Sequence, residues 1–382
     1  MTPEDIRRIR KRIDITLENF RSVYGCYVNG KGDIVTTMEI SILDMHSEEK
    51  EMYAAMLKKV LSGRQQKNLM DIEFSAQQVG KSDEHKLLMA LNESELKDEG
   101  LRTLLYQRII ESYNNDGNSY LILLASDTYD LASKDQKHEE WSEESTGQFR
   151  YFICAICPVK TSKAALQYSA DEHEFRGIST GSILSAPSLG FMFPVLDEGS
   201  ADIYRSLYYS RSSADIHDEL IEGLFNAERH PMAADLQKET FNYALADSLG
   251  KECSLDVITS LQAQMAAIAE KGEMDKSREI PMIAVGDVDD ILAAKGVSDE
   301  GRQEFRETIE DKFDGASEFV INNLIQKKGF EVRTPETRIV TEPETALRLK
   351  TRTIDGATYI LVPIGETVTV NGVEIAIEFD EE

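Results

Sequence analysis

Long apolar runs, cysteine and positive charge are all scarce in this chain of 382 residues. The longest apolar runs, at 120–125 and 151–159, are strand-sized and fall far short of the ~20 residues that a membrane-crossing helix needs. Residues 1–6 include acidic side chains and no apolar segment, so we expect no signal peptide and a cytoplasmic location. Four cysteines are too few to indicate a disulfide framework, which agrees with a reducing compartment.

Basic residues are outnumbered, since 42 lysines and arginines stand against 69 aspartates and glutamates, for a net charge of −27. A surface of this sign repels phosphate, so we expect neither general nucleic-acid binding nor membrane binding. The charge either keeps the protein soluble or favours a basic partner, and mimicry of a nucleic acid is a third interpretation. The partners left to consider are another protein and a second copy of the chain.

The periodicity of apolar residues predicts an α+β fold in three parts. Residues 1–211 alternate helical patterns with short β-branched and aromatic runs, which indicates a mixed α/β N-terminal domain. Helical spacing dominates residues 212–328, up to a last helix expected at 315–327. Residues 329–382 switch to period-two alternation with Asp-Gly and Asn-Gly turns, so we predict a small β-rich C-terminal end.

The first predicted helix, residues 4–20, carries the densest basic cluster of the chain. Its apolar residues recur every three or four positions from Ile6 to Phe20, and Thr2-Pro3 is a suitable helix start. This cluster is either a solvated helix face or a surface that docks an acidic groove, in a partner or in the protein's own acidic body. Its members are Arg7, Arg8, Arg10, Lys11 and Arg12.

Four carboxylates follow two strongly apolar runs. A buried strand is predicted at 120–125, followed by an exposed connection over 127–147, and a second apolar segment spans 190–194. Ligand sites concentrate after central strands of α/β sheets, and converging carboxylates can hold Mg²⁺ or Mn²⁺ for phosphoester hydrolysis. Alternatively, they are ordinary loop residues of an acidic protein. The candidate metal ligands are Asp127, Asp130, Asp197 and Asp202.

Two short motifs have the spacing of reactive sites. Cys154 and Cys157 have the C-x-x-C spacing of zinc and redox sites, but they lie in a predicted strand, where residues three apart point to opposite faces. We favour burial over metal or redox use for both thiols. Residues 177–181 read G-x-S-x-G, but Pro187 argues against the helix that follows a serine nucleophile, so we predict a loop.

An aromatic and arginine cluster lies at residues 204–211. Tyr208, Tyr209 and Arg211 are of the types enriched at protein interfaces. On a strand, Tyr208 and Tyr209 point to opposite faces. We therefore expect one face to lie in the core and consider the other as a partner-binding surface.

Several segments are familiar as a set: GCYVN at 25–29, LILL at 121–124 with DTYD at 127–130, CAICPV at 154–159, LGFMFP at 189–194 and KETF at 238–241. Together they resemble a bacterial family, domain of unknown function 4317, found chiefly in gut Firmicutes. The resemblance runs over nearly the whole chain and implies a bacterial cytoplasmic protein of shared architecture. It implies no activity and no catalytic residue.

The sequence contains no high-specificity catalytic or nucleotide-binding motif. We therefore predict a non-enzymatic binding or regulatory protein with an acidic interaction surface and no cofactor. The alternative is a Mg²⁺- or Mn²⁺-dependent hydrolase that acts on a phosphoester.

Overall fold

The computed structural model describes residues 1–131, 147–169, 173–197, 199–227, 230–274, 280–325, 329–364, 368–370 and 372–376. The fold is mixed α+β, as predicted, and the chain divides into two compact units, residues 1–233 and 234–382. No helix within the described ranges combines the length and apolar character needed to cross a bilayer.

The first unit contains five helices and twelve strands among the described residues. The helices are α1 (Pro3–Arg12), α2 (Ser47–Val60), α3 (Asp83–Glu93), α4 (Glu99–Ser112) and α5 (Asp218–Phe225). The strands are β1 (Ser22–Val28), β2 (Ile34–Ser41), β3 (Leu69–Glu73), β4 (Tyr120–Leu131), β5 (Gly147–Ser162), β6 (Ala165–Ser169), β7 (Glu174–Ile178), β8 (Gly181–Leu184), β9 (Leu189–Phe193), β10 (Val195–Asp197), β11 (Ser200–Asp202) and β12 (Arg205–Ser210).

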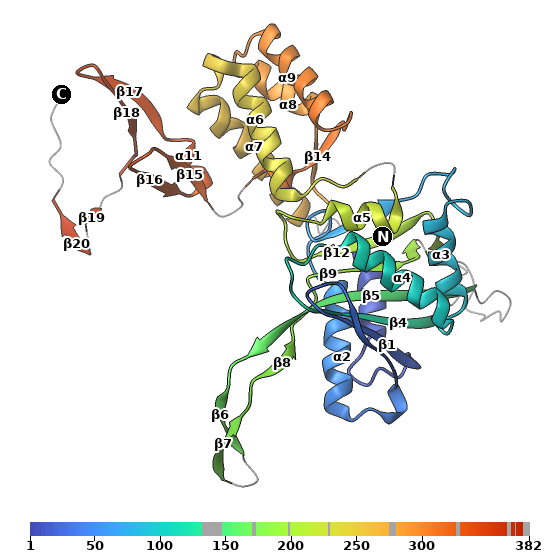
Figure 1. The fold of residues 1–382 in the computed structure, drawn as a ribbon. Coiled ribbons are helices and arrows are strands. Elements are labelled where there is room, and N and C mark those ends of the chain that lie inside the picture. The colour runs from blue at the N-terminus through green and yellow to red at the C-terminus, as the bar shows by residue number, and fades with distance from the viewer. Residues whose placement is uncertain are drawn as a thin grey trace, which may run out of the picture. The chain divides into compact units, whose positions relative to one another are not determined.

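An antiparallel sheet forms the middle layer of this unit, in the order β2-β1-β4-β5-β9-β12-β3, with β8 also paired to β5. Helices α3, α4 and α5 cover one face, where Leu88, Leu105 and Ile221 join the core (Figure 1). Helices α1 and α2 cover the other, where Ile9 and Leu57 join a second core. We call these the α3 face and the α1 face. Helix α5, which the sequence placed in the helical region, packs into the core of this first unit.

Strand β5 shows how sequence alternation builds both cores. Phe152, Cys154 and Ile156 lie in the core of the α3 face, whereas Ile153 and Ala155 lie in the core of the α1 face. Cys157 also belongs to the α1 face. The two cysteines of the C-x-x-C pair are therefore buried on opposite faces, as the strand periodicity predicts.

Helix α1 is shorter than the predicted helix at 4–20 and ends at Arg12. It begins as expected, with Thr2 as N-cap and Pro3 in the first turn. The Asn19 side chain donates to the Arg12 carbonyl at 2.8 Å, and Asp14 accepts from the backbone of Leu17 at 2.9 Å. These side-chain bonds replace the helical ladder, while the continuing apolar spacing still buries Leu17 and Phe20.

Strand β4 is longer than the strand predicted at 120–125, because the ladder with β5 continues to Leu131↔Gly147. The prediction that an exposed connection begins at residue 127 is therefore wrong for 127–131. Asp127 is buried inside the strand, which is tolerated because its charge is neutralised there. Residues 132–146 of the predicted connection lie outside the described residues.

A two-stranded arm extends the β5 strand beyond the large sheet. The end of β5 pairs with β8 from Val159↔Leu184 to Ser162↔Gly181, and the chain between them forms the hairpin β6–β7 (Figure 1). We call residues 165–178 the arm hairpin. Gly177 and Ile178 end strand β7 and Gly181 begins strand β8, so only residues 179–180 of the predicted G-x-S-x-G loop lie between strands. The residues that follow form β8 and not a helix, as expected.

The second unit combines helices with small two-stranded sheets. Its helices are α6 (Ala234–Leu249), α7 (Leu255–Met274), α8 (Val285–Ala294), α9 (Asp299–Lys312), α10 (Ile321–Leu324) and α11 (Pro343–Ala346). Its strands are β13 (Met282–Ala284), β14 (Glu318–Val320), β15 (Phe330–Arg333), β16 (Arg338–Thr341), β17 (Lys350–Ile354), β18 (Ala357–Leu361), β19 (Val368–Val370) and β20 (Val373–Ile375).

The helix predicted at 315–327 is wrong, because its first part forms strand β14, which pairs with β13, and only α10 is helical. Phe319 of β14 packs against Phe241 of α6 at 5.5 Å between ring centroids, so the strand fills the helical core. The predicted hairpin at Asp355-Gly356 is confirmed, with φ values of 50° and 81° that suit a tight primed turn.

Candidate functional site

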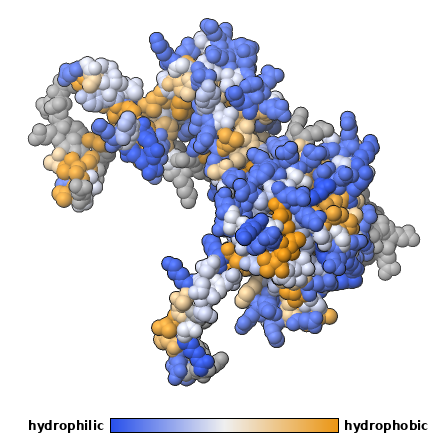
Figure 2. Space-filling model, in the orientation of Figure 1, coloured by the Kyte–Doolittle hydropathy of each residue, from blue (hydrophilic) through white to orange (hydrophobic). Residues whose placement is uncertain are grey.

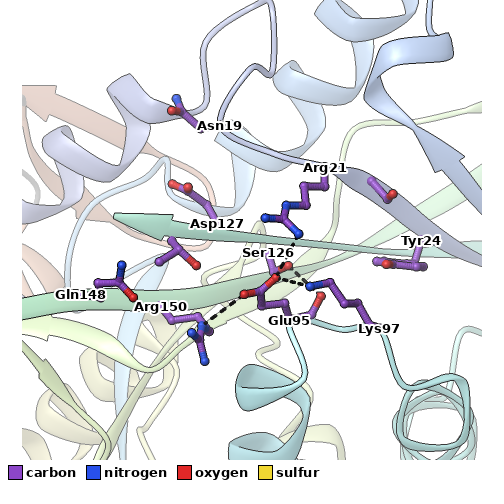
Figure 3. A pocket seen from close by; sticks show the side chains of 11 residues that line it. Asn19, Arg21, Tyr24, Glu95, Lys97, Ser126, Asp127, Gln148 and Arg150 are labelled. Carbon is purple, nitrogen blue, oxygen red and sulfur yellow. Dashed lines mark hydrogen bonds and ion pairs between the residues drawn. The ribbon is translucent and has the colours of Figure 1, made fainter. Parts of the chain in front are cut away.

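A polar pocket of about 330 Å³ lies at one end of the large sheet, lined mainly from the α3 face but also by Asp127. It forms where β4 ends and β5 begins, beyond the C-terminal end of α3 (Figure 3). The pocket is lined by Asn19, Arg21, Ser22, Tyr24, Glu95, Lys97, Ser126, Asp127, Thr128, Gln148 and Arg150.

Glu95 lies at the centre of three cations (Figure 3). Lys97 Nζ is 2.6 Å from Glu95 Oε2, Arg21 Nη1 is 3.8 Å from the same oxygen, and Arg150 Nε is 3.8 Å from Oε1. The hydrogen bond from Lys97 is the largest cause that lowers the pKa of Glu95, followed by the charges of Lys97, Arg150 and Arg21 against the effect of burial. The carboxylate is therefore ionised at neutral pH.

The backbone that presents Glu95 is strained. Glu95 and Leu96 both have positive φ, at 52° and 63°, a conformation that costs a non-glycine residue about 1–3 kcal/mol. Two contacts hold this turn, since Ser126 Oγ donates to the Glu95 carbonyl at 3.0 Å and the Arg102 guanidinium donates to the Leu96 carbonyl. Leu96 itself is fully buried in the core. The position of Glu95 is thus fixed by both strand β4 and helix α4.

Arg150 forms the inner wall of the pocket. It follows the alternation of β5, in which Phe152 points into the core of the α3 face, so Arg150 points to the same face. Its Nη1 donates to the Glu93 carbonyl at 3.4 Å. Its Nε is buried and has no hydrogen-bond partner. The anionic group that it faces is Glu95 Oε1 at 3.8 Å, an ion pair without a hydrogen bond.

A different arrangement occupies the α1 face of the same two strands. Arg12 donates from Nε to Asp127 Oδ2 at 2.5 Å and from Nη2 to Oδ1 at 2.8 Å, a bidentate pair. Tyr151 donates to Asp127 Oδ2 at 2.9 Å, and the Tyr129 ring lies 4.6 Å below the guanidinium. The hydrogen bond with Asp127 raises the pKa of Arg12, and burial raises the pKa of Tyr151 well above its ordinary value.

The chain was compared with protein-family models, curated proteins and solved structures. The family model for a domain of unknown function, DUF4317, matches residues 1–373. The chain belongs to this family. No curated protein and no solved structure matches the chain significantly. Membership of the DUF4317 family agrees with the resemblance drawn from the short segments and brings no activity with it.

Three of the four predicted metal ligands are held by arginines. Asp127 is paired with Arg12, and Asp197 and Asp202 both bind Arg205, each at 2.5 Å. Asp130 lies in β4, but its side chain lies outside the described residues. Among the side chains that are described, no three of His, Cys, Asp and Glu gather where they could hold a metal ion. The structure thus gives these aspartates ion-pair partners within the chain.

The predicted partner-binding residues divide into exposed and buried sets. Arg7, Arg10 and Lys11 are exposed on α1, whereas Arg8 pairs with Glu4 of the same helix. Arg12 is used inside the protein, which is the internal docking that the sequence left open.

Tyr208 and Tyr209 are core residues, because strand β12 is covered on both of its faces. Tyr208 belongs to the core of the α3 face and Tyr209 to that of the α1 face, and neither is more than 2% exposed. Arg211 donates to the Pro187 carbonyl. Both tyrosines are therefore absent from the surface that a partner would meet.

The thiols of the C-x-x-C pair are poor nucleophiles. Burial raises the pKa of Cys154 well above its ordinary value and that of Cys157 to about 12. The thiolate is the reactive form of cysteine, so both side chains, which stay protonated at neutral pH, are unreactive. This placement agrees with the structural role that we favoured from the sequence.

The sequence did not indicate the cations that meet at Glu95. Arg21 precedes β1, Lys97 lies between α3 and α4, and Arg150 is in β5, so the pocket joins three distant segments. Each residue alone is an ordinary surface charge in the sequence. Only the antiparallel pairing of β1, β4 and β5 brings them together, and no local motif carries that information.

Proposed function

We propose that this protein is a non-enzymatic binding protein of the bacterial cytoplasm, which docks onto another protein chain through the arm hairpin. The observation that carries the proposal is a one-sided apolar face on β6–β7. Tyr168 and Phe175 are directly paired across the two strands, and Leu166 is two residues away on the same face. These side chains are 49%, 68% and 72% exposed, respectively.

The arm hairpin carries its large apolar side chains outside the two cores of the first unit. The Tyr168 and Phe175 rings lie 5.4 Å apart, so they form one aromatic patch, and Figure 2 shows hydrophobic residues along the arm. The residues on the other face of the hairpin include Glu174 and Arg176, which suit water. A two-stranded hairpin is only marginally stable alone in water. Covering the aromatic face by a protein surface would stabilise it.

The charge of the chain favours one kind of partner. At a net charge of −27, the protein repels acidic surfaces and attracts basic ones. The proposed partner therefore presents an apolar groove for the arm within a basic surface, and the acidic body of this protein forms the surrounding contact. This interaction requires neither a cofactor nor nucleic acid.

The cysteines support the cytoplasmic part of the proposal. All four are free, and Cys26, Cys154 and Cys157 are buried. Burial raises the pKa of Cys26 to about 11, so it is stable as a thiol in a reducing compartment.

Site-specific photo-crosslinking in intact bacterial cells tests the proposal. A photoreactive phenylalanine analogue replaces Phe175 in the full chain, and the matched control carries it at Glu174, the next residue, on the opposite face. We expect one dominant protein adduct from position 175 and little from position 174. Its mass distinguishes a second copy of the chain from another protein. Equal labelling from both positions, or none from either, contradicts the proposal.

A further inference from the structure

The charge balance of the Glu95 pocket differs from that of the whole chain. Within the lining, Arg21, Lys97 and Arg150 surround a single carboxylate, Glu95. The remaining lining carboxylate, Asp127, is already matched by Arg12. The pocket thus holds a local surplus of two positive charges in a protein whose net charge is −27. Cations placed together in this way repel one another unless an anion joins them.

The surplus matches the charge of one kind of ligand. A phosphate monoester carries about −1.5 to −2 at pH 7 and presents three strong acceptor oxygens, whereas a carboxylate carries only one negative charge. Arginine and lysine are the side chains that bind phosphate, by directed hydrogen bonds and as a point charge. The guanidinium of Arg150 lines the pocket with its Nε 3.8 Å from Glu95 Oε1, so it faces the anionic centre to which a phosphate oxygen would add.

We propose that the pocket around Glu95 binds the phosphate group of a small polar phosphate ester. The volume of about 330 Å³ exceeds what a phosphate ion alone requires and lies at the lower end of ligand pockets, which start at about 300 Å³. Hydroxyl groups of Ser22 and Thr128 are part of the remaining lining and suit a polar ester group rather than an apolar one.

Glu95 has a defined role in this site. In the empty pocket its carboxylate holds Lys97 at 2.6 Å and keeps Arg21 and Arg150 within 3.8 Å, so the cations are gathered before a ligand arrives. The same negative charge repels an incoming phosphate. Replacing Glu95 by a neutral residue should therefore remove ion pairs from the empty pocket and strengthen saturable phosphate binding there.

Calorimetric titration of the full chain with two probes, inorganic phosphate and glycerol 3-phosphate, tests the site, with acetate at equal ionic strength as the anion control. We expect saturable binding of both phosphates, tighter for the ester, and none of acetate. Lys97→Gln and Arg150→Gln should each weaken binding about tenfold or more. The matched control Lys31→Gln, an exposed lysine outside the pocket, should leave it unchanged.

Glu95→Gln decides the question even where an arginine variant fails to fold. We expect this variant to bind both phosphates more tightly than the native chain, and its melting temperature to rise more when phosphate is added. Three results overturn the proposal: no saturable phosphate binding at millimolar concentrations, equal weakening by Lys31→Gln, or weaker binding by Glu95→Gln.

Discussion

The two faces of strands β4 and β5 differ in charge balance at the same end of the sheet. On the α1 face, one cation and one carboxylate match, and Asp127 is bound by Arg12 and Tyr151 in a buried, bidentate arrangement. On the α3 face, three cations share the single carboxylate of Glu95, and the Nε of Arg150 meets it at 3.8 Å without a hydrogen bond. The matched set, Arg12 with Asp127, joins helix α1 to the sheet. The unmatched set, three cations around Glu95, has positive charge that an anionic ligand could neutralise.

Breaking the matched set should have the largest effect on stability. Arg12→Ala leaves the carboxylate of Asp127 buried, with a side chain only 1% exposed, and without a counter-charge. We expect a loss of about 3 kcal/mol or more in the free energy of unfolding. Urea denaturation measures it, with Arg10→Ala on the exposed side of the same helix as control. Equal stability of the two variants would show that the pair contributes little.

Tyr151→Phe tests the second contact to the same carboxylate. It removes one hydrogen bond to Asp127 but leaves Arg12 in place, so we expect a smaller loss, about 1.5 kcal/mol. Because both side chains bind Asp127, the double variant with Arg12→Ala should not show the sum of the two losses. Strict additivity in urea denaturation would contradict the shared site.

Glu95→Gln should have the smallest effect on stability and a distinct pH dependence. Its partners Lys97 and Arg21 are largely exposed, so we expect a loss of at most about 1 kcal/mol at neutral pH. The folded pKa of Glu95 lies below its ordinary value of 4.5. Its stabilisation is therefore fully present above about pH 4.5 and is lost as the pH falls through the lowered folded pKa.

Thermal unfolding between neutral pH and pH 3 measures this difference. The native chain and Glu95→Gln should converge in stability on acidification, whereas the exposed control Glu174→Gln should track the native chain throughout. A gap that stays constant below pH 4.5 would mean that the ionised carboxylate is not what stabilises the pocket.

The sequence predicts the fold class and most elements well where one periodicity runs through a whole element. Helix α3 starts at a local capping residue, Ser82, and β5 buries alternate residues on its two faces. The predictions fail where side-chain bonds to the backbone, or a contact between distant residues, override the apolar periodicity. Helix α1 ends early because Asp14 and Asn19 bond to the backbone, and β4 runs on because Arg12 neutralises Asp127.

The candidate site was predictable only in part. The basic cluster at 7–12 and the carboxylate at Asp127 were both noted, but their pairing across 115 residues has no signal in a single sequence. Glu95 and Lys97 sit in a short connection between helices, where charged residues are ordinary. Their role depends on the strained backbone at Glu95 and Leu96 and on the convergence of cations from distant segments, and both arise only in the folded chain.

Strand β5 has a mechanical consequence. It is 16 residues long, about 50 Å at ~3.3 Å per residue, and it runs without interruption from Arg150 at the pocket to Ser162 at the base of the arm. Its middle is clamped by hydrogen bonds to β4 on one side and β9 on the other. An extended chain held in this way acts as a stiff rod under tension. We expect the two ladders to resist together, in shear, a pull applied to β5 through the arm hairpin.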